Sequence, residues 1–221
     1  MLIYAKHSFR ASPRRLARDL GSCVAARPGP DLDETREWLI AIGQLEQAVL
    51  DAGWEGADLV SAATIAAADL FLAKRSSLRC ADRIRSFTEH LALALHRAET
   101  ILKARELEIR VPEGFAWYAL YPDSFAQTAE AWSHRYGAAG SDISVVGLRS
   151  IGTTLAAVVA QTLRNRGLTV TDYLTVRTSG EPFSRRVELP AGFAPASQNI
   201  IVDEGPGLSG SSMVAVARAL Q

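Results

Sequence analysis

The stretch Asn199–Ser212 (NIIVDEGPGLSGSS) joins an apolar run, two carboxylates and a turn rich in glycine and serine. Asn199 and the apolar run Ile200–Val202 predict a buried strand, and the residues after the turn predict a helix. Strand, glycine-rich turn and helix in this order are typical of a parallel α/β sheet. In such sheets ligands bind at the carboxyl ends of the strands, so the turn is a candidate binding site.

An earlier segment has the same order. Ile143–Gly147 predicts a buried strand, Thr153–Arg166 the helix after it, ended by Gly167, and Leu168–Val176 a second strand that the polar pair Thr171–Asp172 interrupts. We therefore expect residues 111–221 to form an α/β core with a parallel sheet.

The first half of the chain has helical periodicity instead. Apolar positions from Trp38 to Leu50 predict one helix, begun by the acidic turn Asp31–Glu34 and ended by Gly53. A second helix is predicted over Leu59–Lys74 with Asp58 as its cap, and a third over Leu78–Lys103. Residues 1–110 are thus expected to be a mostly helical N-terminal region.

Composition restricts the partners. Lys plus Arg and Asp plus Glu number 24 each in 221 residues, so no global field attracts the chain to nucleic acid or an anionic membrane. The longest apolar run, Leu59–Ala73, is too short for a membrane span, and residues 1–21 contain no apolar stretch long enough for a signal peptide, which favours a soluble, cytoplasmic protein. Cys23 and Cys80 lie far apart and are expected to be buried as small hydrophobic side chains.

The glycine-rich turn has three interpretations. Its G-x-G-x-x-G spacing is that of a dinucleotide-binding turn, but Asp203 and Glu204 would face the pyrophosphate, and the chain ends before a ribose-binding acid. A ribose that carries one phosphate uses more of the residues: the two acids accept hydrogen bonds from its hydroxyls, while backbone N–H groups and serines hold the phosphate. In the third interpretation Ser211 or Ser212 only caps a helix.

The second interpretation leads to a family. IIVDEGPGLSGSSM (residues 200–213) resembles the phosphoribosyl pyrophosphate (PRPP) motif of the type I phosphoribosyltransferases, and VVGLRSIGTTLA (residues 145–156) resembles their pyrophosphate loop. The connection from Arg177 to Arg186 has the place of the family's flexible loop. This resemblance covers about residues 140–221 and implies a Rossmann-like parallel sheet.

The resemblance also implies a role for each site residue. Arg149, Asp203 and Glu204 would be catalytic, and the two acids would bind the ribose hydroxyls. The 5-phosphate would be held by Gly207, Leu208, Ser209, Gly210, Ser211 and Ser212. The pyrophosphate would be held by Leu148, Arg149, Ser150, Ile151 and Gly152, and the flexible loop would bring Arg177, Arg185 and Arg186. Mg²⁺ would arrive with the substrate, without direct protein ligands. Gly207 or Leu208 stands where some members carry an acid that assists catalysis, so proton transfer is not assigned.

The expected activity is transfer of the phosphoribosyl group from PRPP to an unknown acceptor with release of pyrophosphate. The alternatives are a non-catalytic module that senses PRPP or a nucleotide, and a dinucleotide-binding domain. A homodimer is compatible with either of the first two. The family core continues beyond the helix at which this chain ends, so either further strands follow Gln221 or the N-terminal part completes the sheet.

Two residue types are left without a role. The aromatic residues that could stack on a base are expected to lie more often in the core; they are Trp117, Tyr118, Tyr121, Tyr136 and Phe183. The histidines have no metal-binding spacing and are expected on helix faces or the surface; they are His7, His90, His96 and His134.

Overall fold

The computed structural model describes residues 8–76, 80–137, 140–205 and 209–221. The chain divides into two compact units, Met1–Ala119 and Leu120–Gln221. The division comes later than the residue 110 expected from the sequence, because the short helix α5 (Glu113–Ala116) belongs to the first unit.

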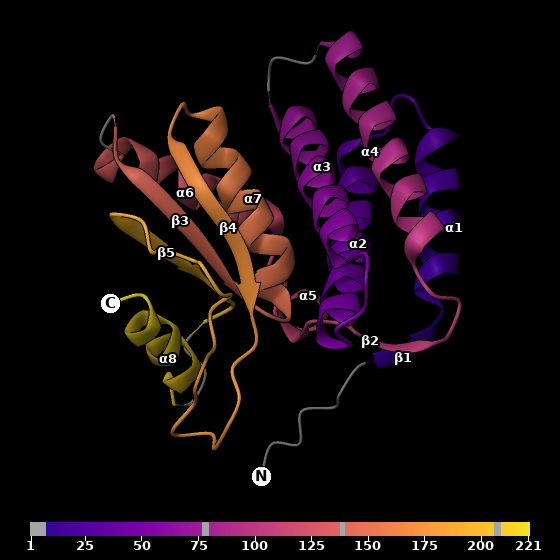
Figure 1. Ribbon diagram of the computed structural model, residues 1–221. Helices are drawn as coiled ribbons and strands as arrows, with labels where there is room; N and C mark the ends of the chain where they lie inside the picture. The colour runs from indigo at the N-terminus through magenta and orange to yellow at the C-terminus, as the bar shows by residue number, and fades with distance from the viewer. Residues whose placement is uncertain (1–7, 77–79, 138–139, 206–208) are drawn as a thin grey trace. The chain divides into compact units, whose positions relative to one another are not determined.

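The first unit is a bundle in which helices α1–α4 lie side by side (Figure 1). Its elements are β1 (Ser8–Ala11), α1 (Pro13–Ala25), α2 (Leu32–Asp51), α3 (Ala57–Arg75), α4 (Ala81–Ile101), β2 (Leu107–Arg110) and α5. Strands β1 and β2 pair antiparallel, with Ser8 opposite Arg110. Fully buried side chains such as Leu39, Phe71 and Leu91 fill the bundle. The prediction of a helical first half is confirmed.

The helix starts agree with the sequence in one case and not in another. Helix α2 begins with a capping box, in which Asp31 Oδ1 accepts from the Glu34 N–H at 2.8 Å and Glu34 Oε2 from the Asp31 N–H at 2.9 Å. The prediction that Asp58 caps α3 is wrong. The Gly56 carbonyl already accepts from Val60 N, so Asp58 lies inside the first turn.

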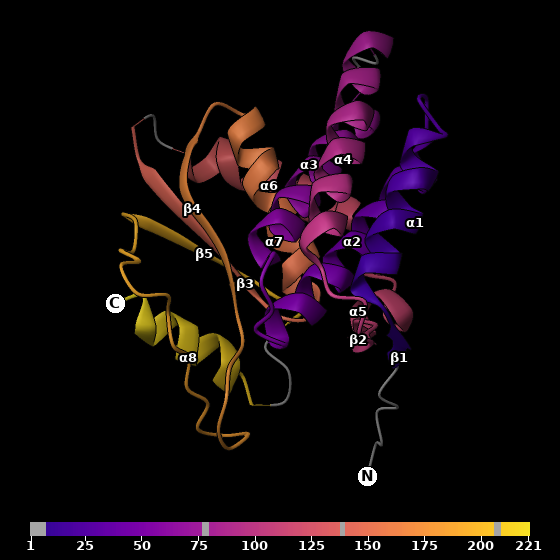
Figure 2. The ribbon, with the colours of Figure 1, turned by 45° about the vertical axis from the view of Figure 1, so that its right-hand side comes forward.

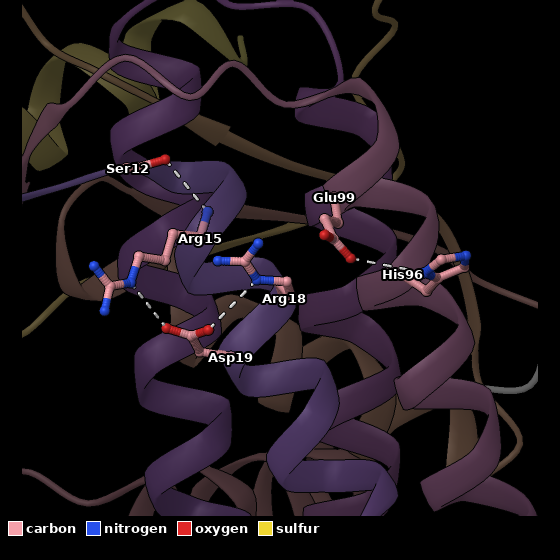
Figure 3. A network of polar contacts seen from close by, with 6 residues as sticks. All are labelled: Ser12, Arg15, Arg18, Asp19, His96 and Glu99. Atoms are coloured by element: carbon pink, nitrogen blue, oxygen red, sulfur yellow. Dashed lines mark hydrogen bonds and ion pairs between the residues drawn. The ribbon is translucent and has the colours of Figure 1, made fainter.

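Charged side chains on α1 and α4 form local surface contacts (Figure 3). Asp19 lies 3.4 Å from Arg15 Nε and 3.7 Å from Arg18 Nε, and His96 lies 3.7 Å from Glu99. Most of these side chains are exposed, and exposed ion pairs contribute little to stability. His90, His96 and His134 all lie on helix surfaces, as predicted, while His7 lies outside the described residues.

Both cysteines are exposed, so the prediction that they are buried is wrong. Helix α1 turns Ala17 and Val24 toward the bundle, which leaves Cys23 on its outer surface. Cys80 occupies the position directly before α4, where the chain turns into the helix. Burial of free cysteine is a general tendency, and the helical phase decides the individual case.

The second unit is an α/β structure with a parallel sheet, as predicted. Its elements are α6 (Pro122–Tyr136), β3 (Asp142–Leu148), α7 (Ile151–Asn165), β4 (Thr169–Val176), β5 (Gln198–Val202) and α8 (Ser211–Ala219). The strand order is β4-β3-β5. Ile143 pairs with Val170 and Ser144 with Asp172, so Thr171 forms a β-bulge at the polar interruption noted in the sequence.

Layers cover both faces of this sheet (Figure 2). Helix α7 packs along one face with α6 against it, while α8 contributes to the other. Val146, Leu148 and Val176 form a cluster with Val216 of α8 and Phe193 of the connection after β4. Among the described residues, β1 and β2 pair with each other and no strand of the first unit joins β4-β3-β5.

No helix in the described parts of the chain is both long and apolar enough to cross a membrane.

Candidate functional site

The candidate site lies where the three parallel strands end. Leu148 of β3 pairs with Val176 of β4, and the residue before it, Gly147, pairs with Val202 of β5. The segments that begin at Arg149, Arg177 and Asp203 therefore leave the same edge of the sheet at nearly the same level. The structure thus brings together the two arginines and the acid pair that lie far apart in the sequence.

Arg149 and Arg177 interlock at this edge. The Arg149 N–H donates to the Val176 carbonyl at 2.9 Å and extends the β3–β4 pairing by one residue. Its guanidinium donates from Nε to Thr175 Oγ1 at 3.2 Å and from Nη2 to the Thr175 carbonyl at 3.0 Å. Arg177 Nη1 donates to the Arg149 carbonyl at 3.1 Å. Both side chains are half-buried, which places fixed positive charge beside the strand ends.

The turn from β3 into α7 is packed at backbone distance. A Cβ on Gly147 would lie 2.2 Å from the Gly152 carbonyl oxygen, and a Cβ on Gly152 would lie 2.6 Å from the Val202 carbonyl oxygen. Only glycine fits at either position without a shift of the backbone. These two glycines allow β3, β5 and the first turn of α7 to meet at one point.

The five residues predicted for the pyrophosphate loop divide into two groups. Leu148 is the last residue of β3, and Ile151 and Gly152 are the first two residues of α7; all three are buried. Arg149 and Ser150 are half-buried at the turn between them. An anion at this turn would therefore contact the Arg149 and Ser150 side chains and the backbone N–H groups that begin α7, and not the Leu148 or Ile151 side chains.

The acid pair follows β5 directly. Asp203 is half-buried and Glu204 exposed, and Asp203 Oδ1 accepts from the Glu204 N–H at 2.9 Å. Burial raises the pKa of Asp203 from 3.8 to about 6; the hydrogen bond from Glu204 opposes this change, and the negative charge of Glu204 adds to it. A carboxylate with a raised pKa at a strand end is a frequent property of functional sites.

The serine turn before α8 is held by the connection that follows β4. Ser209 Oγ donates to the Pro182 carbonyl at 2.9 Å, and Ser211 Oγ donates to the same oxygen. Ser212 Oγ lies 3.1 Å from Thr178 Oγ1. Gly210 has φ 64, the left-handed conformation that lets the chain turn into α8. The predicted phosphate ligands Gly207 and Leu208 lie outside the described residues.

The remaining arginines of the connection contact their own segment. Arg185 Nη1 donates to the Gly180 carbonyl at 2.8 Å, and the Arg186 backbone pairs with Ser179. Arg177, the first of the three arginines predicted for a flexible loop, instead donates its hydrogen bond to the segment after β3, at the Arg149 carbonyl.

Two contributors to the site were missed in the sequence. Thr175 orients the Arg149 guanidinium, and Thr178 contacts the serine turn. Both lie within two residues of the carboxyl end of β4, so the rule that pointed to Arg149 and Asp203 also applied to them.

The aromatic side chains do not lie in the core, contrary to expectation. Tyr121 and Tyr136 are each 52% exposed, and Phe183 is 84% exposed. Trp117 and Tyr118 are also exposed. These residues lie at helix ends and in the connections between elements.

No group of three or more His, Cys, Asp or Glu side chains able to hold a metal ion occurs among the described residues. No protein-family model, no curated protein and no solved structure matches the chain in the comparisons.

Proposed function

We propose that the second unit binds PRPP together with Mg²⁺ and transfers its phosphoribosyl group to an acceptor, with release of pyrophosphate. The observation that carries this proposal is that Arg149 and the Asp203–Glu204 pair follow neighbouring strands at the same end of a parallel sheet, with the serine turn of α8 after the acids. The Rossmann-like fold of the type I phosphoribosyltransferases, with β4-β3-β5 as part of its sheet, belongs to the same proposal.

The ribose 5-phosphate half of the substrate would lie over β5. Carboxylates accept hydrogen bonds from neighbouring ribose hydroxyls, which is the role of Asp203 and Glu204. Ser209 and Ser211 both donate to a single carbonyl oxygen in this structure. Two hydroxyls that converge on one oxygen can receive a phosphate oxygen in the same way, and the N–H groups that begin α8 add partial positive charge.

The pyrophosphate half would lie over the turn between β3 and α7. Displacement at ribose C1 has an oxocarbenium-like transition state, in which negative charge accumulates on the departing pyrophosphate. Preorganised donors stabilise such charge most effectively. The contacts of Arg149 with Thr175, and of Arg177 with the Arg149 carbonyl, fix the two guanidinium groups before a ligand arrives.

The residues present fit a substrate-borne Mg²⁺. This ion takes one or two carboxylates from a protein and completes its octahedral shell with substrate oxygens and water. Asp203 and Glu204 are two adjacent carboxylates at the strand end, and they would hold the substrate-bound ion through its water molecules rather than as direct ligands. Bound there, Mg²⁺ would supply positive charge to the pyrophosphate; the chain's own contribution is to orient the ribose and to hold the phosphates.

A protein that binds PRPP without consuming it is the second candidate. It is favoured by the sequence of the glycine-rich turn, in which Gly207 or Leu208 stands where some members of the family carry an acid that assists catalysis. Both candidates predict PRPP binding that depends on Asp203 and Glu204.

Two measurements test the proposal. Calorimetric titration with PRPP, with and without Mg²⁺, is expected to show binding that requires the ion. Pyrophosphate release is then measured over a panel of purine, pyrimidine and pyridine bases. Release with one class of base supports the transferase, whereas binding without release over the whole panel supports the sensor. Binding of a dinucleotide in place of PRPP would contradict both.

A further inference from the structure

The connection after β4 begins with a small hairpin, residues 179–186. Ser179 and Arg186 exchange two backbone hydrogen bonds of 2.9 Å, and Arg185 Nη1 donates to the Gly180 carbonyl at 2.8 Å. The tip of the hairpin carries Pro182 and the exposed Phe183. After the hairpin, Val187, Leu189 and Phe193 pack against the sheet. The hairpin is therefore a local unit whose far end is anchored in the core.

The hairpin tip and the serine turn contact one another through hydroxyls. Ser209 and Ser211 both donate to the Pro182 carbonyl, and Thr178, which precedes the hairpin, contacts Ser212. A serine hydroxyl has one proton to donate. Ser209 and Ser211 therefore cannot donate to Pro182 and to a phosphate oxygen at the same time.

We propose that this hairpin occupies the phosphate position of the free protein, so that a bound phosphate displaces it. The inference rests on the proposed function, because it takes the serine turn as the phosphate site. The inference also says how the site is regulated: the hairpin competes with the ligand, and it moves away from the serine turn when the phosphate binds. A loop that closes over a bound ligand would move in the opposite direction.

The contact of Ser209 and Ser211 with the Pro182 carbonyl is strong enough to lower the affinity for phosphate and weak enough for a bound phosphate to displace it. Two neutral hydrogen bonds hold the tip, and Phe183 is 84% exposed, so little apolar surface is buried there. The apparent affinity of a ligand falls by the fraction of molecules whose site is open. For two such hydrogen bonds we expect a reduction of about tenfold in the affinity for ribose 5-phosphate.

Trypsin measures the direction of movement, because Arg185 and Arg186 lie in the hairpin. Proteolysis of a segment that opens and closes rapidly follows the population of its open form. The rate of cleavage after these arginines, relative to cleavage after the exposed Arg105 in the first unit, is measured in the full chain with ribose 5-phosphate and with inorganic phosphate. We expect either ligand to accelerate cleavage in the hairpin. Protection by a ligand that binds would overturn the proposal, as would an unchanged rate.

Two variants test the contact from each side. Removal of both donors in Ser209→Ala plus Ser211→Ala is expected to accelerate cleavage without any ligand. Ser197→Ala is the matched control, because Ser197 Oγ donates to the Asp142 carbonyl at 3.0 Å, away from the hairpin. Gly180 has φ +90, so Gly180→Ala strains the hairpin and leaves the serines intact. It should bind ribose 5-phosphate up to about tenfold more tightly than the wild type.

The outcomes separate this inference from the proposed function. If ribose 5-phosphate and PRPP do not bind at all, the proposed function fails and the competition fails with it. If they bind and hairpin cleavage slows or stays constant, only the competition is overturned. A serine double variant cleaved at the wild-type rate would show that the hydroxyls do not hold the hairpin.

Discussion

Neutralising the acid that follows β5 should stabilise the folded protein above pH 6. In Asp203→Asn the side chain keeps its size but cannot lose a proton. Burial raises the pKa of Asp203 from 3.8 to about 6, so between these values the folded chain holds a proton that the unfolded chain has released. Stability therefore falls as the pH rises through this window, and the wild type carries the full cost above pH 6.

The magnitude follows from the shift. About two pKa units correspond to about 3 kcal/mol, and because Asp203 is only half-buried, screening by water reduces the expected cost to about 2 kcal/mol. The difference in unfolding free energy between Asp203→Asn and the wild type should be near zero at pH 3.5. It should increase from pH 4 to pH 6 and stay constant above pH 7.

Urea unfolding at a series of pH values measures this difference. The control is Glu188→Gln, which neutralises an exposed carboxylate of the same unit and should change the unfolding free energy little at any pH. A difference for Asp203→Asn that does not vary with pH, or an Asp203→Asn protein less stable than the wild type at pH 7, would refute the reasoning.

Three further predictions concern packing, capping and binding. Gly152→Ala should destabilise the second unit by about 2 kcal/mol or more, because its Cβ would lie 2.6 Å from a backbone carbonyl; Gly29→Ala, which meets nothing within 4 Å, should have little effect in the same thermal unfolding assay. Asp31→Ala should lower the unfolding free energy of the first unit by about 1 kcal/mol, since it removes the carboxylate that accepts from the Glu34 N–H. In urea unfolding, a midpoint equal to that of the wild type would show that the cap does not contribute. PRPP affinity with Mg²⁺ should fall below about pH 6 as Asp203 takes up a proton, by at most tenfold per pH unit, and calorimetry of Asp203→Asn should lose this dependence.

The strands of the second unit could be predicted because they are short, apolar and bounded by clear turn residues, whereas helix α6 was not predicted. Even the polar pair Thr171–Asp172 had a structural counterpart, the bulge opposite Ile143 and Ser144. The rule that ligands bind where parallel strands end predicted that Arg149 and Asp203 lie at the same end of the sheet. The register of β3 with β4 and β5 then shows that the segments beginning at Arg149, Arg177 and Asp203 leave the sheet at nearly the same level.

Other features depended on long-range contacts that local patterns do not encode. The Pro182 carbonyl is a backbone group, so no residue type in the sequence indicates its role. It nevertheless accepts hydrogen bonds from two serines 27 and 29 residues away. The phase of α1 decided the exposure of Cys23, and Gly56, rather than the better capping residue Asp58, precedes α3. Average tendencies for free cysteine and for Asp at helix starts were overridden by the path of the backbone.

The direct test of the central claim is PRPP binding by a variant that lacks both acids. Calorimetric titration in the presence of Mg²⁺ compares the wild type, Asp203→Ala plus Glu204→Ala, and the control Glu106→Ala plus Glu108→Ala, which removes two exposed acids from the first unit. We expect Mg²⁺-dependent binding that the control keeps and the Asp203–Glu204 variant loses. No binding by the wild type, or equal binding by all three proteins, would contradict it.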